Sequence, residues 1–335
     1  MTDKKTNTIH LLLVLFTSVL LISISCQSNN RTRILKLGHG LDTEHPVHKG
    51  MVYMSDLLEA KSNGKMKIQI YPSQQLGSER QCVELLQIGS LAMTKVSASV
   101  MEGFAPDYKV LSLPFIFDNR EHSYRILDGE IGNEILLSSE KYWLRGLTFY
   151  DAGSRSFYTI DKPVYHPDDL KGLKIRVMQS PTAMEMVESF GGNPTPISWG
   201  ELYTSLQTGR VDAAENNPPS FWHSFHYEVC KFYSLVEHTT IPDVLLISTI
   251  IWNQLNEQER EWLQEAANES AKYQRTLWQE DELKSYSVVR ENGVTIISKD
   301  EIDIEAFKEK VKPMYISAEK ESRLKDLIHR IAGEV

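Results

Sequence analysis

The strongest constraint on the fold is an alternation of strand-like and helix-like segments that begins at residue 33. Residues 33–40, 65–72 and 91–98 carry the pattern of β-strands, and residues 46–62 and 78–90 between them are typical of helices. The order strand, helix, strand, helix, strand predicts a parallel, doubly wound sheet. Loops at the carboxyl ends of such strands are where α/β sheets bind their ligands.

A second series of strands and helices predicts a second lobe. Segments 144–153, 173–177 and 210–216 are strand-like, and segment 244–252, rich in β-branched residues, returns late in the chain to complete the first sheet. The chain then crosses twice between two α/β lobes, which predicts hinge strands. The expected boundaries are 33–152 plus 242–281 for the first lobe and 153–241 plus 282–335 for the second.

Residues 256–292 form the longest candidate helix of the chain. The segment begins with the cap-like Asn256, contains no Pro and no Gly before its end, and is rich in Glu, Gln, Lys and Ala. A single helix here would extend roughly 50 Å at 1.5 Å per residue, enough to brace both lobes. Two helices with an unrecognised break between them remain the alternative.

The N-terminal segment has the pattern of a secretion signal. Lys4 and Lys5 precede the apolar run 9–25, which is too short and too interrupted by polar residues for a comfortable membrane span. Cys26 follows directly, as at a lipoprotein processing site. We therefore expect a signal peptide over 1–25, a lipidated Cys26 and a linker to residue 32; plain signal cleavage and an uncleaved anchor are the alternatives.

Charge and cysteine content narrow the possible functions. The formal net charge of −9 argues against nucleic acid, whose phosphates select basic surfaces. Cys82 and Cys230 are expected to be buried free thiols, with a disulfide as the alternative.

Motifs of common enzymes are missing from the sequence. There is no nucleophile elbow, P-loop, CxxC pair or HExxH motif, and we expect no cofactor. His45 and His48 have a spacing that metal ligands could have, but no Cys or carboxylate cluster accompanies them, so we predict no metal site.

Two arginines and an amide-rich turn are the remaining specific signals. Arg155 and Arg176 both lie near strand segments of the second lobe, as do Asn216 and Asn217. Two guanidinium groups that meet without a partner repel each other. Their convergence would predict an acidic ligand. For Arg176 alone, the alternative is a solvated face of its strand.

Four segments together resemble the substrate-binding proteins of tripartite ATP-independent periplasmic (TRAP) transporters. They are YPSQQLGSERQCVELLQIGS, DLKGLKIRV, NPTPISWGELYTSLQTGRVDAAEN and HYEVCKFYSL, and the resemblance covers essentially the whole mature chain. The segments AENNPPSFW, MTKVSAS and DAGSRSFY are most similar to members that bind hexuronates such as glucuronate and galacturonate. The resemblance implies a type II-like periplasmic binding protein with two lobes, a long bracing helix and no catalysis.

The resemblance also implies roles for particular residues. Arg176 corresponds to the arginine that pairs with the substrate carboxylate, and Arg155, Asn216, Trp199 and Glu79 correspond to further binding positions. Without the resemblance, Trp199 could equally pack in the core and Glu79 could be a first-turn charge of its helix.

One position departs from the members that bind sialic acid. Where those carry a glutamate, this chain has Ser97, with Lys95 two residues earlier on the same strand face. That difference disfavours sialic acid and favours Lys95 as a second basic contact, although Lys95 could also be a surface residue. His39 and His45 are further candidates from the loops of the first lobe.

The expected function is therefore capture of an acid sugar by lobe closure and its delivery to the small and large membrane subunits of a TRAP transporter. Another organic acid, diketogulonate or sialic acid, is the alternative ligand. A secreted enzyme with Glu79 and Glu215 as its acid and base is a less favoured hypothesis. An extracytoplasmic sensor module acting through another chain is the third.

Overall fold

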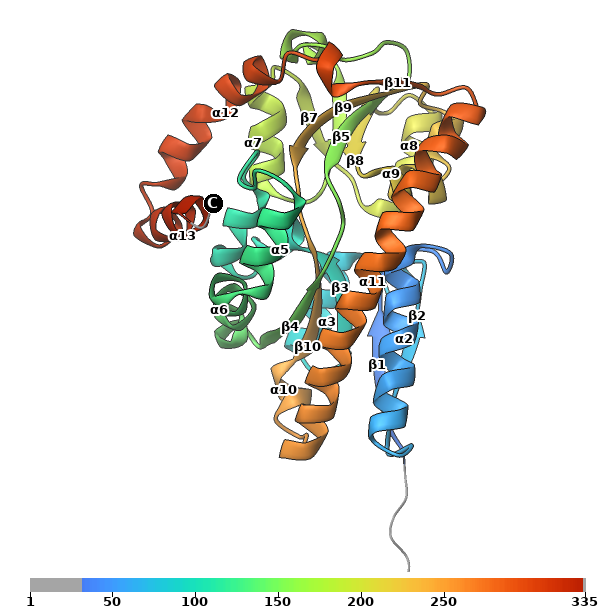
Figure 1. The fold of residues 1–335 in the computed structure, drawn as a ribbon, viewed down its shortest axis with the longest axis vertical. Helices are drawn as coiled ribbons and strands as arrows, with labels where there is room; N and C mark the ends of the chain where they lie inside the picture. The colour runs from blue at the N-terminus through green and yellow to red at the C-terminus, as the bar shows by residue number, and fades with distance from the viewer. Residues whose placement is uncertain (1–31, 334–335) are drawn as a thin grey trace, which may run out of the picture.

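The computed structural model describes residues 32–333, which form two lobes, each built on one β-sheet (Figure 1). The predicted signal peptide 1–25 and Cys26 lie outside the described residues. Within the described part of the chain, no helix has the length and hydropathy of a membrane span.

The first sheet has five strands. Strand β1 pairs in parallel with both β2 and β3, as the strand and helix alternation predicts, and β10 lies antiparallel between β3 and β4. The predicted return of the late apolar segment to this sheet is confirmed, but the strand stops at Ser248 and the next four residues form a helical turn. In sheet order the strands are β2 (Met66–Tyr71), β1 (Arg33–Gly38), β3 (Met93–Ser97), β10 (Asp243–Ser248) and β4 (Leu144–Tyr150).

The second sheet has six strands and mixed directions. Strand β6 pairs in parallel with β7 and β8, whereas β5 is antiparallel to both β8 and β9. In sheet order the strands are β11 (Thr295–Ile297), β9 (Phe232–Thr239), β5 (Arg155–Thr159), β8 (Ala213–Asn216), β6 (Lys174–Val177) and β7 (Asn193–Pro196).

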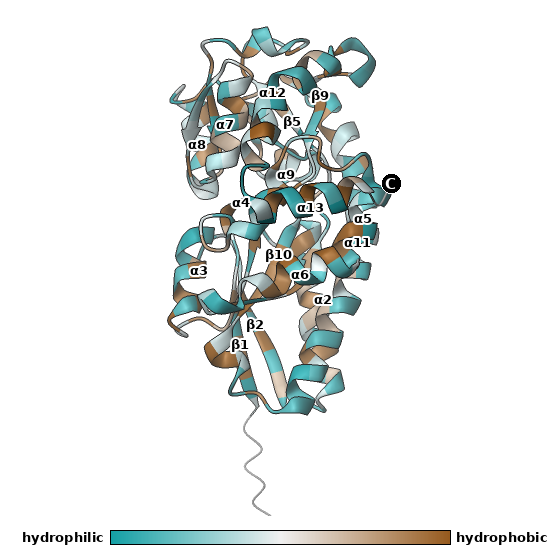
Figure 2. Ribbon diagram, turned by 90° about the vertical axis from the view of Figure 1, so that its left-hand side faces the viewer, coloured by the Kyte–Doolittle hydropathy of each residue, from teal (hydrophilic) through white to brown (hydrophobic). Residues whose placement is uncertain are grey.

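Helices cover both faces of each sheet, and each face carries its own apolar core. Hydrophobic and hydrophilic residues alternate along these helices (Figure 2), as expected for amphipathic helices that pack one face against a sheet. The α-helices are α2 (Pro46–Lys61), α3 (Glu79–Gln87), α4 (Ala98–Met101), α5 (Arg120–Asp128), α6 (Glu130–Ser138), α7 (Pro181–Ser189), α8 (Leu202–Gln207), α9 (Pro218–His223), α10 (Thr249–Trp252), α11 (Glu257–Glu291), α12 (Ile304–Ala318) and α13 (Ser322–Gly333). The short 3₁₀ helices are η1 (Pro106–Ser112), η2 (Glu140–Tyr142), η3 (Pro167–Leu170), η4 (Trp199–Glu201), η5 (His226–Glu228) and η6 (Lys299–Glu301).

Two extended crossings join the lobes, from β4 to β5 and from β9 to β10. The first passes close to α11 at Gly153, whose φ of +56° favours glycine and where a Cβ atom would lie 2.9 Å from the indole nitrogen of Trp278. Helix α11 is one unbroken helix of 35 residues that contacts α2 of the first lobe and α9 of the second. The expectation of a single bracing helix is thus confirmed over the alternative of two.

The C-terminal helix α13 returns to the first lobe. Leu324, Leu327, Ile328 and Ile331 join the apolar cluster of the first lobe, while α12 packs against α7 of the second (Figure 1). This placement differs from the expected boundary, which assigned all of 282–335 to the second lobe. The pattern of an amphipathic helix such as α13 predicts that one face is buried, but it does not predict which lobe covers that face.

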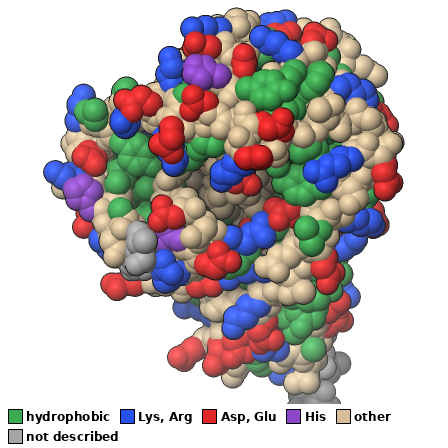
Figure 3. Space-filling model, turned by 45° about the horizontal axis from the view of Figure 1, so that its top comes forward, with side chains coloured by type: hydrophobic (Ala, Val, Ile, Leu, Met, Phe, Trp, Pro, Cys, Tyr) green, Lys and Arg blue, Asp and Glu red, His purple; other side chains and the backbone are tan. Residues whose placement is uncertain are grey.

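Charged side chains are dispersed over the face of the molecule that Figure 3 shows. Acidic and basic groups alternate on the face that Figure 3 presents, rather than forming a field of one sign. The face in this view lacks the continuous basic patch that nucleic acid requires.

A candidate anion site between the lobes

A pocket lies between the two lobes at the carboxyl ends of several strands. The loops after β1 and β6 and the ends of β3 and β8 all contribute to it, as expected for an α/β sheet. The space between the atoms that line it is about 520 Å³, part of which is open to solvent. The lining residues are Gly40, Leu41, His45, Glu79, Lys95, Ser97, Ala152, Arg155, Arg176, Met178, Trp199, Asn216, Asn217, Ser220, Ile241 and Asp243.

Arg176 is the buried cation of this pocket that has no acidic partner among the described residues. It lies on β6, is 3% exposed, and donates from Nε to the backbone oxygen of Ile197 at 2.9 Å. Its Nη1 has no hydrogen-bond partner within residues 32–333, and its guanidinium lies 5.7 Å from the ring of Trp199. Burial lowers the pKa of Arg176, because the charged form lacks the solvation that water would give.

Arg155 is equally buried but is paired within the protein. Its Nε donates to Oε2 of Glu215 at 2.6 Å, and Nη2 donates to Oε1 and to the backbone oxygen of the same residue at 2.9 and 2.8 Å. Its Nη1 donates to Oδ1 of Asn216 at 2.6 Å. The two arginines therefore do not meet as two unpaired cations, and the charge argument for an acidic ligand applies to Arg176 alone.

Glu215 is held in its ionised form by this pairing. Burial alone would raise the pKa of Glu215, but Arg155 and the nearby His238 lower it to about 2. The pair is positioned by the antiparallel ladder of β5 and β8, in which Phe157 lies opposite Glu215.

Lys95 belongs to a cluster of three charges on the first-lobe side of the pocket, in which Lys95 and Asp243 are buried and Glu79 is partly exposed. Its Nζ donates to Oε1 of Glu79 and to Oδ1 of Asp243, both at 3.1 Å. Burial works to lower the pKa of Lys95, but the two carboxylates more than offset it and the pKa is raised. Lys95 lines the pocket as expected, yet its charge is already balanced within the protein.

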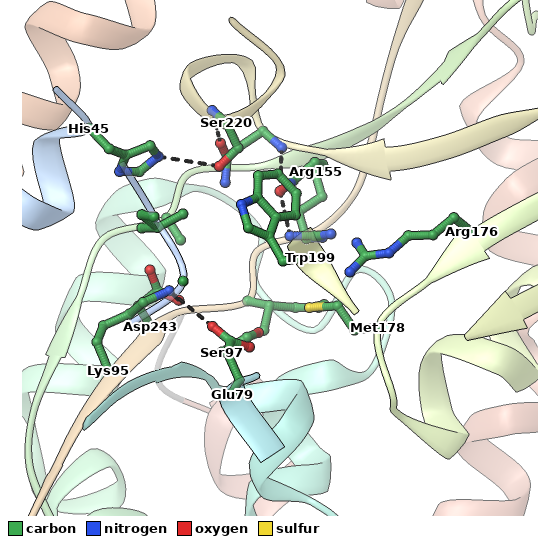
Figure 4. A pocket seen from close by; sticks show the side chains of 16 residues that line it. His45, Glu79, Lys95, Ser97, Arg155, Arg176, Met178, Trp199, Ser220 and Asp243 are labelled. Carbon is green, nitrogen blue, oxygen red and sulfur yellow. Dashed lines mark hydrogen bonds and ion pairs between the residues drawn. The ribbon is translucent and has the colours of Figure 1, made fainter. Parts of the chain in front are cut away.

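His45 lines the pocket and joins the lobes. Its Nδ1 accepts a hydrogen bond from the backbone N–H of Val47 and so caps α2, which leaves Nε2 to donate to Oγ of Ser220 at 3.3 Å (Figure 4). Burial lowers the pKa of His45 well below its usual value, so the ring is neutral.

His39 does not line the pocket, unlike His45. It is buried, its Nε2 lies 3.0 Å from Nδ1 of His48, and its Nδ1 accepts a hydrogen bond from the backbone N–H of Leu41. Of the other expected residues, the structure brings together Glu79, Ser97, Trp199 and Asn216 at the pocket.

Asp243 is the main site residue that the sequence did not suggest. It is the first residue of β10 and lies opposite Ser97 in the ladder with β3, so its side chain is on the same face as Lys95. The sequence signal that could have identified Asp243 is its position as the one carboxylate at the start of the apolar strand β10. Ser220 and Met178 were also not predicted as lining residues.

The described residues contain no cluster of three or more metal-ligating side chains. Cys82 and Cys230 are both buried and free, as expected. What the site offers is one uncompensated cation, amide and hydroxyl groups, and carboxylates. Such a set can bind a small anion that also carries hydroxyl groups.

Comparison with known proteins agrees with this chemistry. The family model described as bacterial extracellular solute-binding protein, family 7, matches residues 37–321. A TRAP periplasmic solute-binding protein from Bradyrhizobium sp. BTAi1, solved in complex with α/β-D-galacturonate, is 40% identical, with a TM-score of 0.86, and the match covers 89% of this chain and 99% of that one.

Two further relatives carry related ligands. The TRAP periplasmic solute-binding protein of Chromohalobacter salexigens DSM 3043, solved with bound D-glucuronate, is 35% identical with a TM-score of 0.87, over 90% of this chain and 100% of that one. The 2,3-diketo-L-gulonate-binding periplasmic protein of Escherichia coli K12 is 31% identical over 82% of this chain and 83% of its own length. This chain therefore belongs to family 7 of the bacterial extracellular solute-binding proteins and is a solute-binding protein of the TRAP type.

Proposed function

We propose that this chain captures a hexuronate, D-glucuronate or D-galacturonate, between its lobes, with the sugar carboxylate on Arg176. The observation that carries the proposal is the burial of Arg176 without an acidic partner among the described residues and with Nη1 unpartnered. A buried, unpaired charge is costly. A carboxylate that accepts two parallel hydrogen bonds from the guanidinium removes that cost and fixes the orientation of the ligand.

The remaining lining groups suit the hydroxyl groups of a sugar. Asn216 accepts from Arg155 and from the backbone of Asn217 through Oδ1, which leaves its amide Nδ2 to donate to the ligand. Glu79 and Asp243 can accept from sugar hydroxyls, and Trp199 offers an aromatic face. Because these groups come from both lobes, ligand binding favours the closed arrangement.

The ligands of the solved relatives support this choice. The Bradyrhizobium and Chromohalobacter proteins hold galacturonate and glucuronate, and the Escherichia coli relative is named for a different six-carbon sugar acid. Each of these ligands carries a single carboxylate. Diketogulonate is therefore the first alternative ligand, and sialic acid is the second, with Ser97 arguing against it.

Titration calorimetry tests the proposal directly. Wild-type protein is titrated with glucuronate and galacturonate beside the neutral sugars glucose and galactose, with 2,3-diketo-L-gulonate and sialic acid as competing candidates. We expect a uronate to bind tightly and the neutral sugars poorly, because they leave Arg176 unpaired in a closed site. Neutral sugars that bind as well as the uronates would contradict the proposal.

Lobe closure has its own readout in small-angle scattering. Saturating uronate should reduce the radius of gyration, because the ligand bridges both lobes. A radius of gyration that does not change on saturation would argue against a receptor that closes on its ligand.

We further propose that the protein acts in the periplasm and delivers its ligand to the membrane subunits of a TRAP transporter. The N-terminal signal pattern and the family support this location. Cys26, outside the described residues, is proposed as a lipid attachment site. Protein purified from membranes should then carry an acyl mass, and Cys26→Ser should be released in soluble form with unchanged ligand affinity; an unmodified wild-type protein would exclude the anchor.

An enzyme acting on acid sugars is the least supported candidate. Glu215 is held as a carboxylate by Arg155 and does not line the pocket, which does not suit a general acid. A turnover assay with uronides and product detection addresses this candidate.

A further inference from the structure

The two sides of the pocket differ in how their charges are compensated. Arg176 on β6 has no acidic partner among the described residues, whereas Lys95 on β3 is shared by two carboxylates, Glu79 and Asp243. Figure 4 shows Arg176 and the Glu79, Lys95 and Asp243 cluster on opposite sides of the pocket. The Arg176 side of the pocket thus carries one uncompensated positive charge. The side of Lys95, Glu79 and Asp243 carries one negative charge more than positive.

We propose that Glu79 and Asp243 restrict this pocket to sugar acids with a single carboxylate and exclude sugar diacids. The inference rests on the proposed function, because it takes the first carboxylate to lie on Arg176. A ligand that extends from Arg176 across the pocket presents its other end to Glu79 and Asp243. Hydroxyl groups there can donate to both carboxylates, whereas a second carboxylate can donate nothing.

A second carboxylate would also find no free cation on that side. Lys95 is 3% exposed and its Nζ lies 3.1 Å from both acidic partners, so its charge is already shared. Burial raises the pKa of Asp243, with Lys95 opposing that shift and Glu79 adding to it. Adding another negative charge beside these groups places like charges together at low dielectric.

The backbone holds this cluster in place. Asp243 lies opposite Ser97 in the β3 and β10 ladder, which puts it diagonally across from Lys95. Glu79 is the first residue of α3, whose start is fixed by a capping box between Ser78 and Gln81. A carboxylate that turned away from an incoming anion would give up its hydrogen bond to Lys95.

Galactonate and galactarate provide a matched pair of ligands for the test. Both are open-chain six-carbon acids, and they differ only in that one end is a CH₂OH group in galactonate and a carboxylate in galactarate. Calorimetric titration of wild-type protein should give a galactarate Kd at least about 100-fold above that for galactonate, equivalent to roughly 2.7 kcal/mol. The same protein is titrated with galacturonate to test the proposed function separately.

The variants Glu79→Gln and Asp243→Asn should each lower the ratio of the galactarate Kd to the galactonate Kd at least about tenfold. Each removes one negative charge and leaves Lys95 with the other acidic partner. Glu84→Gln on the outer side of α3, half-exposed and paired with Arg80, removes the same charge away from the pocket and should leave the ratio unchanged. If open-chain acids bind wild type too weakly to measure, a selective gain of galactarate binding in the two pocket variants supports the inference.

Two outcomes would overturn the inference while leaving the proposed function intact. One is wild-type protein that binds galacturonate and does not distinguish galactarate from galactonate. The other is a ratio of the galactarate Kd to the galactonate Kd that is the same in both pocket variants as in the wild type, together with no selective gain of galactarate binding in either variant. Wild-type protein that binds none of these acids defeats the proposed function and the inference together.

Discussion

Arg155 and Arg176 lie on the same sheet at the same pocket, and both are almost fully buried, with exposures of 5% and 3%. Arg155 makes four hydrogen bonds to Glu215 and Asn216. Arg176 makes one, to a backbone oxygen, and has no carboxylate partner within the described residues. Residue type and burial are thus nearly equal, and only the electrostatic partners differ.

That difference separates a structural role from a ligand-binding role. The desolvation cost of a paired guanidinium is offset by its carboxylate within the protein, and removing the guanidinium leaves that carboxylate buried without a partner. An unpaired guanidinium gains its partner only from a ligand. Substitution of Arg155 should therefore act on stability first, and substitution of Arg176 should act on affinity.

The largest expected effect is the loss of stability on replacing Arg155. Arg155→Met leaves Glu215 buried without its cation and should destabilise the fold by about 3–5 kcal/mol. Arg176→Met is the matched control, since it removes the same group from the same sheet and should not destabilise the apo protein, because no carboxylate loses its partner. Thermal unfolding of both variants without ligand measures the contrast, and equal losses of stability would show that the two arginines do not differ as described.

The second effect concerns acid sensitivity and follows from the pKa of Glu215. A folded-state pKa of about 2, below the ordinary 4.5, means that ionised Glu215 contributes stability above about pH 4.5 that is lost as the pH falls toward 2. The contribution is about 3 kcal/mol. The stability difference between wild type and Glu215→Gln should shrink over this window in unfolding experiments at stepped pH, and a constant difference would contradict the assignment.

The third effect is on ligand affinity at Arg176. Arg176→Lys keeps the charge but loses the planar pair of donors, so it is not a conservative change at a site that grips a carboxylate. Uronate affinity should fall at least about tenfold, or 1.4 kcal/mol, with Arg176→Ala weaker still. Calorimetry decides this, and a lysine variant that binds uronate like wild type would make Arg176 an ordinary strand residue.

The sequence was informative where the determining signal is local. Absence of Pro and Gly after Asn256 was sufficient to predict α11, and the alternation around Arg176 placed it on a strand. The pairing of Lys95 with Asp243 could not be read in the same way, because the two residues are 148 positions apart and meet only through the register of β3 and β10. The resemblance to TRAP proteins supplied the roles of Arg155 and Arg176, but not the difference in their partners.

The smallest expected effect comes from a neutral hydrogen bond between the lobes. Its loss shows how much of the uronate affinity depends on lobe contacts rather than on the charge of Arg176. His45 of the first lobe and Ser220 of the second are joined by a hydrogen bond at 3.3 Å between Nε2 and Oγ, and burial keeps the imidazole neutral by lowering its pKa. Ser220→Ala removes this link between the lobes without removing a charge or the capping of α2 by Nδ1 of His45. A neutral hydrogen bond contributes about 1 kcal/mol, so uronate affinity should fall by no more than about fivefold, and apo stability should stay close to that of wild type. Calorimetry beside Arg176→Ala, which removes the charge, gives the comparison: a loss of uronate affinity in Ser220→Ala as large as that in the Arg176→Ala variant would mean that closure of the lobes, rather than the unpaired charge of Arg176, dominates binding.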